Sequence, residues 1–301
     1  MSTVVPTNVV SPTFYPFKSH YFDRGAGLRM HFLDEGDADA PPVLMVHGNP
    51  SWSFYYRNLV KALSSTHRCI VPDHIGMGLS DKPDDAAYTY SLAQRIDDLS
   101  ALIESLKLTQ PITLVVHDWG GMIGFGWAVK HPERIKRLVI LNTAAFSLPS
   151  DTSFPAALRF TRTWLGSFLV RGFNAFSWGA TVFCCRRNPM PREVALAYRA
   201  PYNTWQNRIA TLRFVQDIPL DPSDRGYALV ESVAAQLHKF DNTPALIPWG
   251  AKDFVFNDAF LRQWQRYLPK AKVHRIADAG HYVLEDAADE IIPMIVDFIR
   301  G

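Results

Sequence analysis

The sequence predicts an α/β protein in which helices flank a mostly parallel sheet and a helical cap is inserted. Short apolar stretches typical of buried strands alternate with helical stretches in the first and last parts of the chain. Between residues 147 and 225 the alternation stops, and the chain reads as helical and aromatic with irregular Pro and Gly. We therefore expect one large core, made of residues 1–146 and 226–301, that is interrupted by a cap at 147–225.

The first elements are a hairpin, two strands and a helix. The hairpin covers residues 20–34, because two short strand patterns flank the turn sequence Arg-Gly-Ala-Gly at 24–27. Residues 43–46 and 69–73 are apolar runs typical of buried strands. Apolar residues at helical spacing predict a helix between these strands, namely Tyr55, Tyr56, Leu59, Val60 and Leu63.

The alternation then continues toward the middle of the chain. A glycine-rich loop at 74–83 leads to an amphipathic helix at 92–106. The apolar face of this helix is formed by Leu92, Ile96, Leu99, Ile103 and Leu106. Residues 112–116 are rich in β-branched and apolar side chains and predict a fully buried strand. An apolar helix at 122–129 and a strand at 138–141 follow.

After the predicted cap the alternation resumes. A strand at 245–249, a helix at 260–267, a strand at 273–276 and a closing helix at 287–299 complete the pattern. Repeated units of this kind build a parallel sheet, and ligands of such sheets bind beyond the carboxyl ends of the strands. The residues that follow each strand are therefore the first candidates for chemistry.

The most informative stretch is the turn His-Asp-Trp-Gly-Gly at 117–121. It joins a strand to a helix through small residues, which is the setting of a nucleophile elbow. Asp118 stands at the apex, where serine stands in the Gly-x-Ser-x-Gly form. A carboxylate is ionised at neutral pH and can attack without a base, which forms an ester. The alternative is that Asp118 only caps the following helix, since aspartate is common at that position.

Two later strand ends supply an acid and a histidine, in the chain order nucleophile, acid, histidine. Asp253 follows the first strand after the cap, and His281 follows the last strand. We predict that His281 activates water toward the ester and that Asp253 orients its imidazole. The alternatives are a structural role for His281 and, for the acid, Asp258 or Asp286. Asn142, at the end of an earlier strand, is neutral and cannot be that acid.

Asn49 and Trp119 are the predicted donors for a leaving anion. Asn49 belongs to the motif His-Gly-Asn-Pro at 47–50, and Trp119 directly follows the predicted nucleophile. Backbone N–H groups at these two places form the oxyanion hole of such sites. The two side chains add an amide N–H and an indole N–H. The alternatives are a turn role for Asn49 and a packing role for Trp119.

Composition narrows the class of partner. The chain is 48% hydrophobic and 20% charged with a formal charge of +2, which gives no reason to expect nucleic acid. The three cysteines suggest neither a disulfide framework nor a zinc site, and we expect no cofactor and no metal. Residues 1–16 lack the positive region of a signal peptide, and no stretch predicts a membrane span. We therefore expect a cytoplasmic protein.

Three motifs resemble those of the haloalkane dehalogenases, which have the α/β-hydrolase fold. They are His-Gly-Asn-Pro at 47–50, Asp-His-Ile-Gly-Met-Gly-Leu-Ser-Asp-Lys-Pro at 73–83 and His-Asp-Trp-Gly-Gly at 117–121. The resemblance covers about residues 15–300. The combination of Asn49 and Trp119 with a late acid, Asp253, is similar to the third subfamily of those enzymes.

Within that branch, further segments resemble the cis-β-lactone decarboxylases of bacterial long-chain olefin biosynthesis. These segments are residues 122–128, 141–146, 173–176, 201–208, 216–220 and 253–256. Those enzymes convert a cis-3,4-dialkyl-oxetan-2-one into a cis-alkene and carbon dioxide. The resemblance implies that Asp118, Asp253 and His281 act on a strained lactone, whose oxygens Asn49 and Trp119 hold. It also implies partner enzymes that make the lactone from two fatty acyl chains and an assembly with them.

Several readings stay open on the sequence alone. A dialkyl β-lactone and a haloalkane are both small apolar substrates that present an electrophilic carbon with a leaving anion. An epoxide hydrolase would need cap tyrosines, for which Tyr198 and Tyr202 are candidates, and a non-catalytic receptor could share the fold. Pocket width should separate the substrates. The candidate wall residues are Trp164, Phe168, Phe173, Phe176, Trp178 and Trp205.

Overall fold

The computed structural model describes residues 10–301 and contains one eight-stranded sheet. The prediction that residues 1–16 are not a signal peptide concerns in part residues 1–9, which lie outside the described residues. The strands are β1 (His20–Gly25), β2 (Leu28–Glu35), β3 (Pro42–Val46), β4 (Arg68–Pro72), β5 (Ile112–Asp118), β6 (Ile135–Thr143), β7 (Ala245–Gly250) and β8 (Lys272–Ile276).

The sheet has the order β1-β2-β4-β3-β5-β6-β7-β8. The β1–β2 hairpin is present as predicted, β2 runs antiparallel to β4, and the other neighbouring strands are parallel. Val116 of β5 pairs with Val46 of β3 and with Ile140 of β6. The carboxyl ends of these three central strands therefore lie together at one edge of the sheet.

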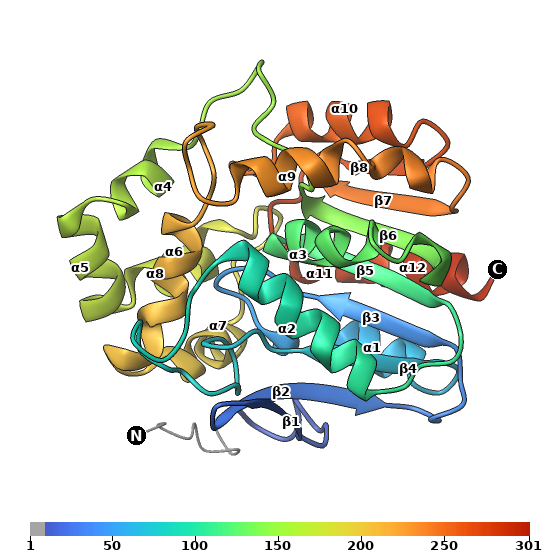
Figure 1. The fold of residues 1–301 in the computed structure, drawn as a ribbon, viewed down its shortest axis with the longest axis horizontal. Coiled ribbons are helices and arrows are strands. Elements are labelled where there is room, and N and C mark those ends of the chain that lie inside the picture. The colour runs from blue at the N-terminus through green and yellow to red at the C-terminus, as the bar shows by residue number, and fades with distance from the viewer. Residues whose placement is uncertain (1–9) are drawn as a thin grey trace.

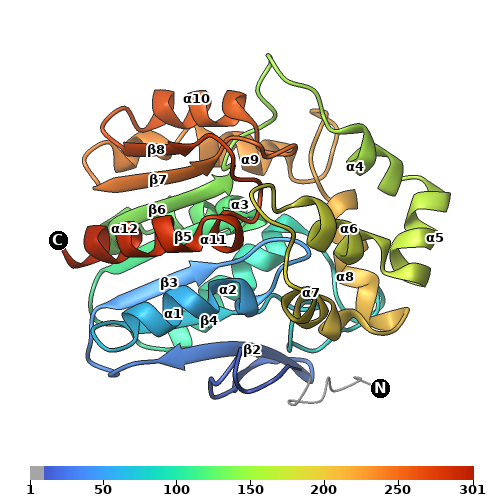
Figure 2. The same ribbon diagram turned by 180° about the vertical axis from the view of Figure 1, so that it is seen from behind.

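Helices cover both faces of the sheet and one of its ends (Figures 1 and 2). Helices α2, α3 and α9 lie on one face, and α1, α11 and α12 on the other. Helices α4 to α8 gather beyond the carboxyl end of β3, where α5 is the outermost helix. Their bounds are α1 (Arg57–Leu63), α2 (Leu92–Ser105), α3 (Trp119–Ala128), α4 (Ala156–Thr161), α5 (Trp164–Phe173), α6 (Ala175–Phe183), α7 (Arg192–Arg199), α8 (Ile209–Gln216), α9 (Tyr227–Ala234), α10 (Asp258–Tyr267), α11 (Val283–Asp286) and α12 (Ala288–Arg300).

The strands and the long core helices lie where the sequence predicts them, and residues 147–244 contain no strand. The prediction is wrong at the start of α3, which begins at Trp119 rather than at residue 122. Two glycines in the first turn hide this start, because glycine is a weak helix former. The prediction also misses α9 and α11, and α11 has only four residues, too few for a periodic pattern. Among residues 10–301, no helix is long and apolar enough to cross a membrane.

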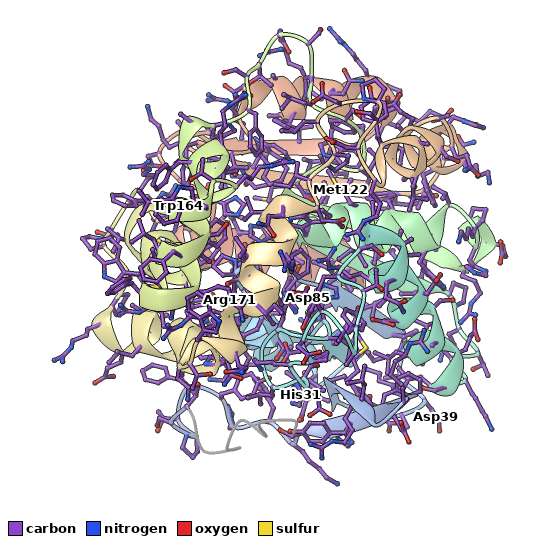
Figure 3. The ribbon with its side chains drawn as sticks, turned by 60° about the vertical axis from the view of Figure 1, so that its left-hand side comes forward. His31, Asp39, Asp85, Met122, Trp164 and Arg171 are labelled. Atoms are coloured by element: carbon purple, nitrogen blue, oxygen red, sulfur yellow. The ribbon has the colours of Figure 1, made fainter. Side chains whose placement is uncertain are left out.

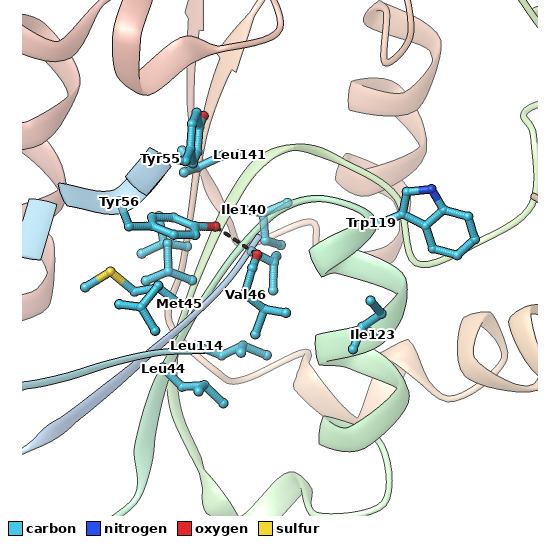
Figure 4. Close-up of a cluster of buried hydrophobic side chains, with 14 of the residues drawn as sticks. Leu44, Met45, Val46, Tyr55, Tyr56, Leu114, Trp119, Ile123, Ile140 and Leu141 are labelled. Carbon is cyan, nitrogen blue, oxygen red and sulfur yellow. Dashed lines mark hydrogen bonds between the residues drawn. The ribbon is translucent and has the colours of Figure 1, made fainter. Parts of the chain in front are cut away.

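The central strands form a rigid floor beneath the site. β3 and β5 are buried along their whole length, as a strand covered by helices on both faces must be. Figure 4 shows Leu44, Val46 and Leu114 in this cluster, with Tyr56 donating a hydrogen bond of 2.9 Å to the carbonyl of Val46. Burial of each aliphatic side chain contributes about 1.5–3 kcal/mol. Trp119, in the first turn of α3, belongs to the same buried cluster.

Candidate active site

The turn between β5 and α3 presents Asp118 in a conformation that L-residues rarely adopt. Its backbone has φ 53° and ψ −127°, and its side chain accepts no helix-capping hydrogen bond, so the capping alternative is not supported. The turn is tight, since a Cβ on Gly120 would lie 1.9 Å from the carbonyl oxygen of Val46. Glycine is therefore required at residue 120, as a nucleophile elbow demands.

Asp118 is buried beside hydrogen-bond donors. The backbone N–H of Asn49 donates to Asp118 Oδ1 over 2.6 Å. A Cβ on Gly48 would lie 1.9 Å from the same oxygen, so only glycine leaves room for the carboxylate there. Burial raises the pKa of Asp118, but His281, His117 and the N–H of Asn49 together outweigh burial, and the pKa lies below its ordinary value. The carboxylate is thus ionised at neutral pH.

His281 lies between two carboxylates. Its Nδ1 is 2.7 Å from Asp253 Oδ2, and its Nε2 is 3.5 Å from Asp118 Oδ2. Burial alone would lower the pKa of His281. Asp253 and Asp118 have a larger effect in the opposite direction and raise this pKa to about 10. The two carboxylates therefore favour the charged imidazolium form of the ring. The structure brings together the three predicted residues, which come from three separate stretches of the chain.

Among the acids considered from the sequence, only Asp253 contacts His281. Asp258 forms an exposed ion pair with Arg275 at 2.8 Å. Asp286 accepts hydrogen bonds from backbone N–H groups, including that of Gly280 at 2.7 Å. Both alternatives are thus occupied elsewhere, which leaves Asp253 as the partner of the histidine.

Two further residues support the site and were missed by the sequence reasoning. Asn142, at φ 30°, donates from Nδ2 to Asp253 Oδ2 over 3.0 Å and bridges to the backbone of Gly250. His117 lies 2.9 Å, through Nε2, from the carbonyl oxygen of His281. In the sequence, the position of Asn142 near the end of a predicted strand is the feature that could have indicated its role in the site. His117 has no signal beyond its position next to Asp118.

We expect Asn142→Ala to lower the free energy of unfolding by about 1–3 kcal/mol, because buried partners on Asp253 and Gly250 lose their hydrogen bonds. Denaturant titration measures this change. Asn242→Ala is the matched control, since Asn242 is exposed and accepts one hydrogen bond from Lys270. Equal midpoints for the two variants would contradict a bridging role for Asn142.

Asn49 and Trp119 both line the cavity above Asp118. Asn49 Nδ2 donates one of its hydrogens to the carbonyl of Thr211 in α8 over 3.0 Å, which ties this side chain to the cap. No residue between 10 and 301 accepts a hydrogen bond from the indole N–H of Trp119. The Trp119 ring packs edge-on against Phe214 at 5.3 Å between centroids. The indole N–H thus stays available for a bound anion.

The cavity has a volume of about 490 Å³ and is walled mainly by apolar side chains of the cap. Of the six aromatic residues proposed as walls, only Phe176 lines it. The prediction is wrong for the other five, which are exposed instead: Trp164, Phe168, Phe173, Trp178 and Trp205. Leu158, Leu169 and Val170 are among the residues that take their place. Residues 10–301 contain no cluster of side chains that could hold a metal ion.

Comparison with known proteins gives consistent matches over most of the chain. A family model described as alpha/beta hydrolase fold matches residues 41–288. A cis-3-alkyl-4-alkyloxetan-2-one decarboxylase of Shewanella oneidensis is 59% identical, covering 95% of this chain and 90% of that protein. The protein of the same name from Xanthomonas campestris pv. campestris is 51% identical, covering 95% of this chain and 97% of that protein.

A solved structure matches the architecture. The crystal structure of haloalkane dehalogenase DbeA from Bradyrhizobium elkani superimposes with a TM-score of 0.82 and 28% sequence identity. The match covers 95% of this chain and 98% of that chain.

Proposed function

Because this chain belongs to the α/β-hydrolase family, whose matched members are named as enzymes, we propose that it is a cis-3-alkyl-4-alkyloxetan-2-one decarboxylase. It would convert a cis-disubstituted β-lactone into a cis-alkene and carbon dioxide. One observation carries this choice of substrate: the identity to the two named decarboxylases is about twice that to the dehalogenase structure. The apolar lining of the cavity suits a dialkyl substrate.

In the first step we infer that Asp118 attacks the ring carbon C4 of the lactone. The new bond joins a carboxylate oxygen of Asp118 to C4, and the bond from C4 to the ring oxygen breaks. The ring opens to a carboxylate, and Asn49 and Trp119 would donate N–H groups to it. Release of ring strain assists this step, and no water or proton is consumed.

In the second step the opened carboxylate leaves as carbon dioxide. The electron pair of the C3–CO₂ bond forms the C3=C4 double bond, and the bond from C4 to Asp118 breaks, which restores the free carboxylate. Attack inverts C4, and elimination with the two leaving groups anti then places both alkyl chains on the same side. The sequence of steps therefore yields the cis-alkene from the cis-lactone.

His281 would assist the departure of Asp118. As an imidazolium held by Asp253, it can donate a hydrogen bond to the departing carboxylate and stabilise its developing charge. This role differs from the water activation expected from the sequence. Its basis is the raised pKa of His281, which favours the charged ring at neutral pH.

A haloalkane dehalogenase is the second candidate, favoured by a carboxylate that faces two N–H donors in an apolar cavity. In that reaction Asp118 would form an alkyl ester, and neutral His281 would have to activate water. An epoxide hydrolase finds no support, because the tyrosines it would need, Tyr198 and Tyr202, do not line the cavity. Tyr198 hydrogen bonds to Glu285 instead.

The test gives the purified protein a cis-β-lactone with long alkyl chains and, separately, 1,2-dibromoethane. We expect alkene and carbon dioxide from the lactone and little bromide from the haloalkane. A reaction without protein, run in parallel, measures the spontaneous decarboxylation of the lactone. Bromide release with the lactone untouched would leave the dehalogenase as the function.

We also propose the place of this reaction in a sequence. A dialkyl β-lactone must come from enzymes that join two fatty acyl chains, so the chain would act in long-chain olefin biosynthesis and assemble with those enzymes. Cosedimentation of this protein with lactone-forming enzymes tests the assembly. Separate sedimentation of the components would contradict it.

A further inference from the structure

The cap carries an exposed apolar surface, here named the cap face, on the three consecutive helices α4, α5 and α6. It consists of the aromatic side chains of Phe160, Trp164, Phe168, Phe173, Trp178 and Phe183, which are between 45% and 81% exposed. Three of them lie on α5, which lies at the outer margin of the cap (Figure 1). A group of large exposed apolar side chains on adjoining helices is typical of a contact surface.

The cap face is aromatic rather than aliphatic. Trp164 is 81% exposed and Phe173 is 69% exposed. Neither side chain lines the cavity, so the proposed reaction does not account for them. Tryptophan and phenylalanine favour the boundary between water and lipid, where an apolar ring can insert beneath the headgroups.

The charge of the cap is unlike that of the remaining chain. Residues 156–216 contain nine arginines, no lysine and one acidic residue, Glu193, whereas the other residues contain 22 basic and 28 acidic ones. Within residues 10–301, only Arg187 and Arg213 of these nine arginines form an ion pair with a carboxylate. The other seven arginines form no ion pair with a carboxylate of the described residues.

Some of these unpaired arginines border the cap face. Arg159 is exposed and directly precedes Phe160. The guanidinium of Arg171 lies 4.6 Å from the ring centroid of Trp205, whose ring lies 6.1 Å from that of Phe168. Figure 3 shows Trp164 and Arg171 toward opposite ends of α5. An apolar centre bordered by positive charge complements an anionic lipid surface.

The cap face is continuous with the cavity. Phe160 and Phe183 line the cavity, yet they are 45% and 49% exposed. Arg186, which also lines the cavity, is exposed as well. The mouth of the cavity therefore opens among the exposed rings and beside a positive charge.

We propose that the cap face docks onto an anionic lipid bilayer. The aromatic rings enter the boundary between headgroups and acyl chains, and the arginines contact the phosphate groups. The cavity mouth then faces lipid, in which a dialkyl lactone and its alkene product both dissolve. Docking itself follows from the surface, whereas delivery of the lactone rests on the proposed function.

The test is flotation of the whole protein with vesicles, without substrate. Vesicles of phosphatidylcholine with phosphatidylglycerol are compared with vesicles of phosphatidylcholine alone. We expect binding to the anionic vesicles, weaker binding as salt is raised, and little binding to the neutral ones. The double variant Trp164→Ser/Phe173→Ser should lose binding by about tenfold or more, because both inserted rings are gone.

Two matched controls separate the cap face from general effects. Leu196→Ser removes an apolar side chain that is 50% exposed on α7, outside the cap face, and should leave vesicle binding unchanged. Arg159→Glu should weaken binding to the anionic vesicles. Lys136→Glu makes the same charge change near the start of β6, at the opposite end of the sheet, and should have little effect.

Three results would overturn docking. The first is no binding to anionic vesicles at low salt, and the second is a loss of vesicle binding in Leu196→Ser as large as that in the double variant. The third is a protein oligomer that dissociates in Trp164→Ser/Phe173→Ser. The last result would make the cap face a contact between copies. Turnover of dispersed lactone is measured separately on the same preparation. Vesicle binding without turnover would overturn the proposed function alone, and turnover without vesicle binding would overturn docking alone.

Discussion

Asp118→Asn is expected to lower lactone turnover by roughly 10⁴-fold or more, the scale seen when a nucleophile is removed. The amide has nearly the shape of the carboxylate, so the turn and the hydrogen bond from Asn49 can persist. It is not a nucleophile at neutral pH and cannot form the ester to C4. Gas chromatography of the alkene, after subtraction of the spontaneous reaction, measures the loss.

The control for this variant is Asp278→Asn. Asp278 lies three residues before His281, and its side chain is 65% exposed in an ion pair with Arg187. It should retain wild-type turnover, because its carboxylate lies outside the cavity. Substantial alkene formation by Asp118→Asn would show that the lactone fragments without a nucleophile.

Asp253→Asn is expected to lower turnover by roughly 10²–10⁴-fold, as removal of the acid of a triad does. It should also change the dependence of activity on pH. Burial lowers the pKa of His281, and Asp253 is the largest of the contributions that raise it to about 10. The imidazolium is present below that pKa and is lost as the pH rises through it. Without Asp253 the pKa falls, so activity should decline at a lower pH than in the wild type.

The direction of the wild-type profile tests the role of His281. If the imidazolium assists departure of Asp118, activity falls as the pH rises through the pKa of the substrate complex. If neutral His281 acts as a base, activity rises over the same range. Asp258→Asn is the control, because Asp258 pairs with Arg275 and does not contact His281. Its profile should match that of the wild type.

Much of the core could be predicted from the sequence because its signals are local. The strand at residues 112–116 is a run of β-branched and apolar residues, and the structure extends it as β5 to Asp118. The parallel arrangement followed from the alternation of strands and helices. Helix α11 has too few residues for a periodic pattern, and glycines hide the first turn of α3.

The candidate site was predictable in part. Asp118 ends a strand, and Asp253 and His281 follow strands, so strand order places them at one edge of the sheet. Their catalytic roles stay a prediction. The hydrogen bond from Asn142 to Asp253 could not be foreseen, because it depends on the pairing of β6 with β7 and on a positive φ. The contact of Asn49 with Thr211 likewise requires the position of the cap.

The cap was predicted least well. Its aromatic residues were expected to face the cavity, because large apolar side chains are usually buried. Helical spacing identifies an apolar stripe on α5 but not what the stripe faces. In the structure, Trp164 and Phe168 point outward, while Leu169 and Val170 of the same helix line the cavity. Helix α5 thus carries apolar side chains both on its outer side and on the side that faces the cavity. The sequence pattern alone could not tell these two sides apart.

The most direct test of the central claim is to trap the ester on Asp118. His281→Phe lacks the imidazolium that assists departure, so a single turnover with the cis-β-lactone, quenched rapidly, should leave the lactone bound to the protein. Mass spectrometry is expected to show the peptide containing Asp118 heavier by the mass of the intact lactone. An unmodified peptide, with alkene still forming at the wild-type rate, would contradict covalent catalysis by Asp118.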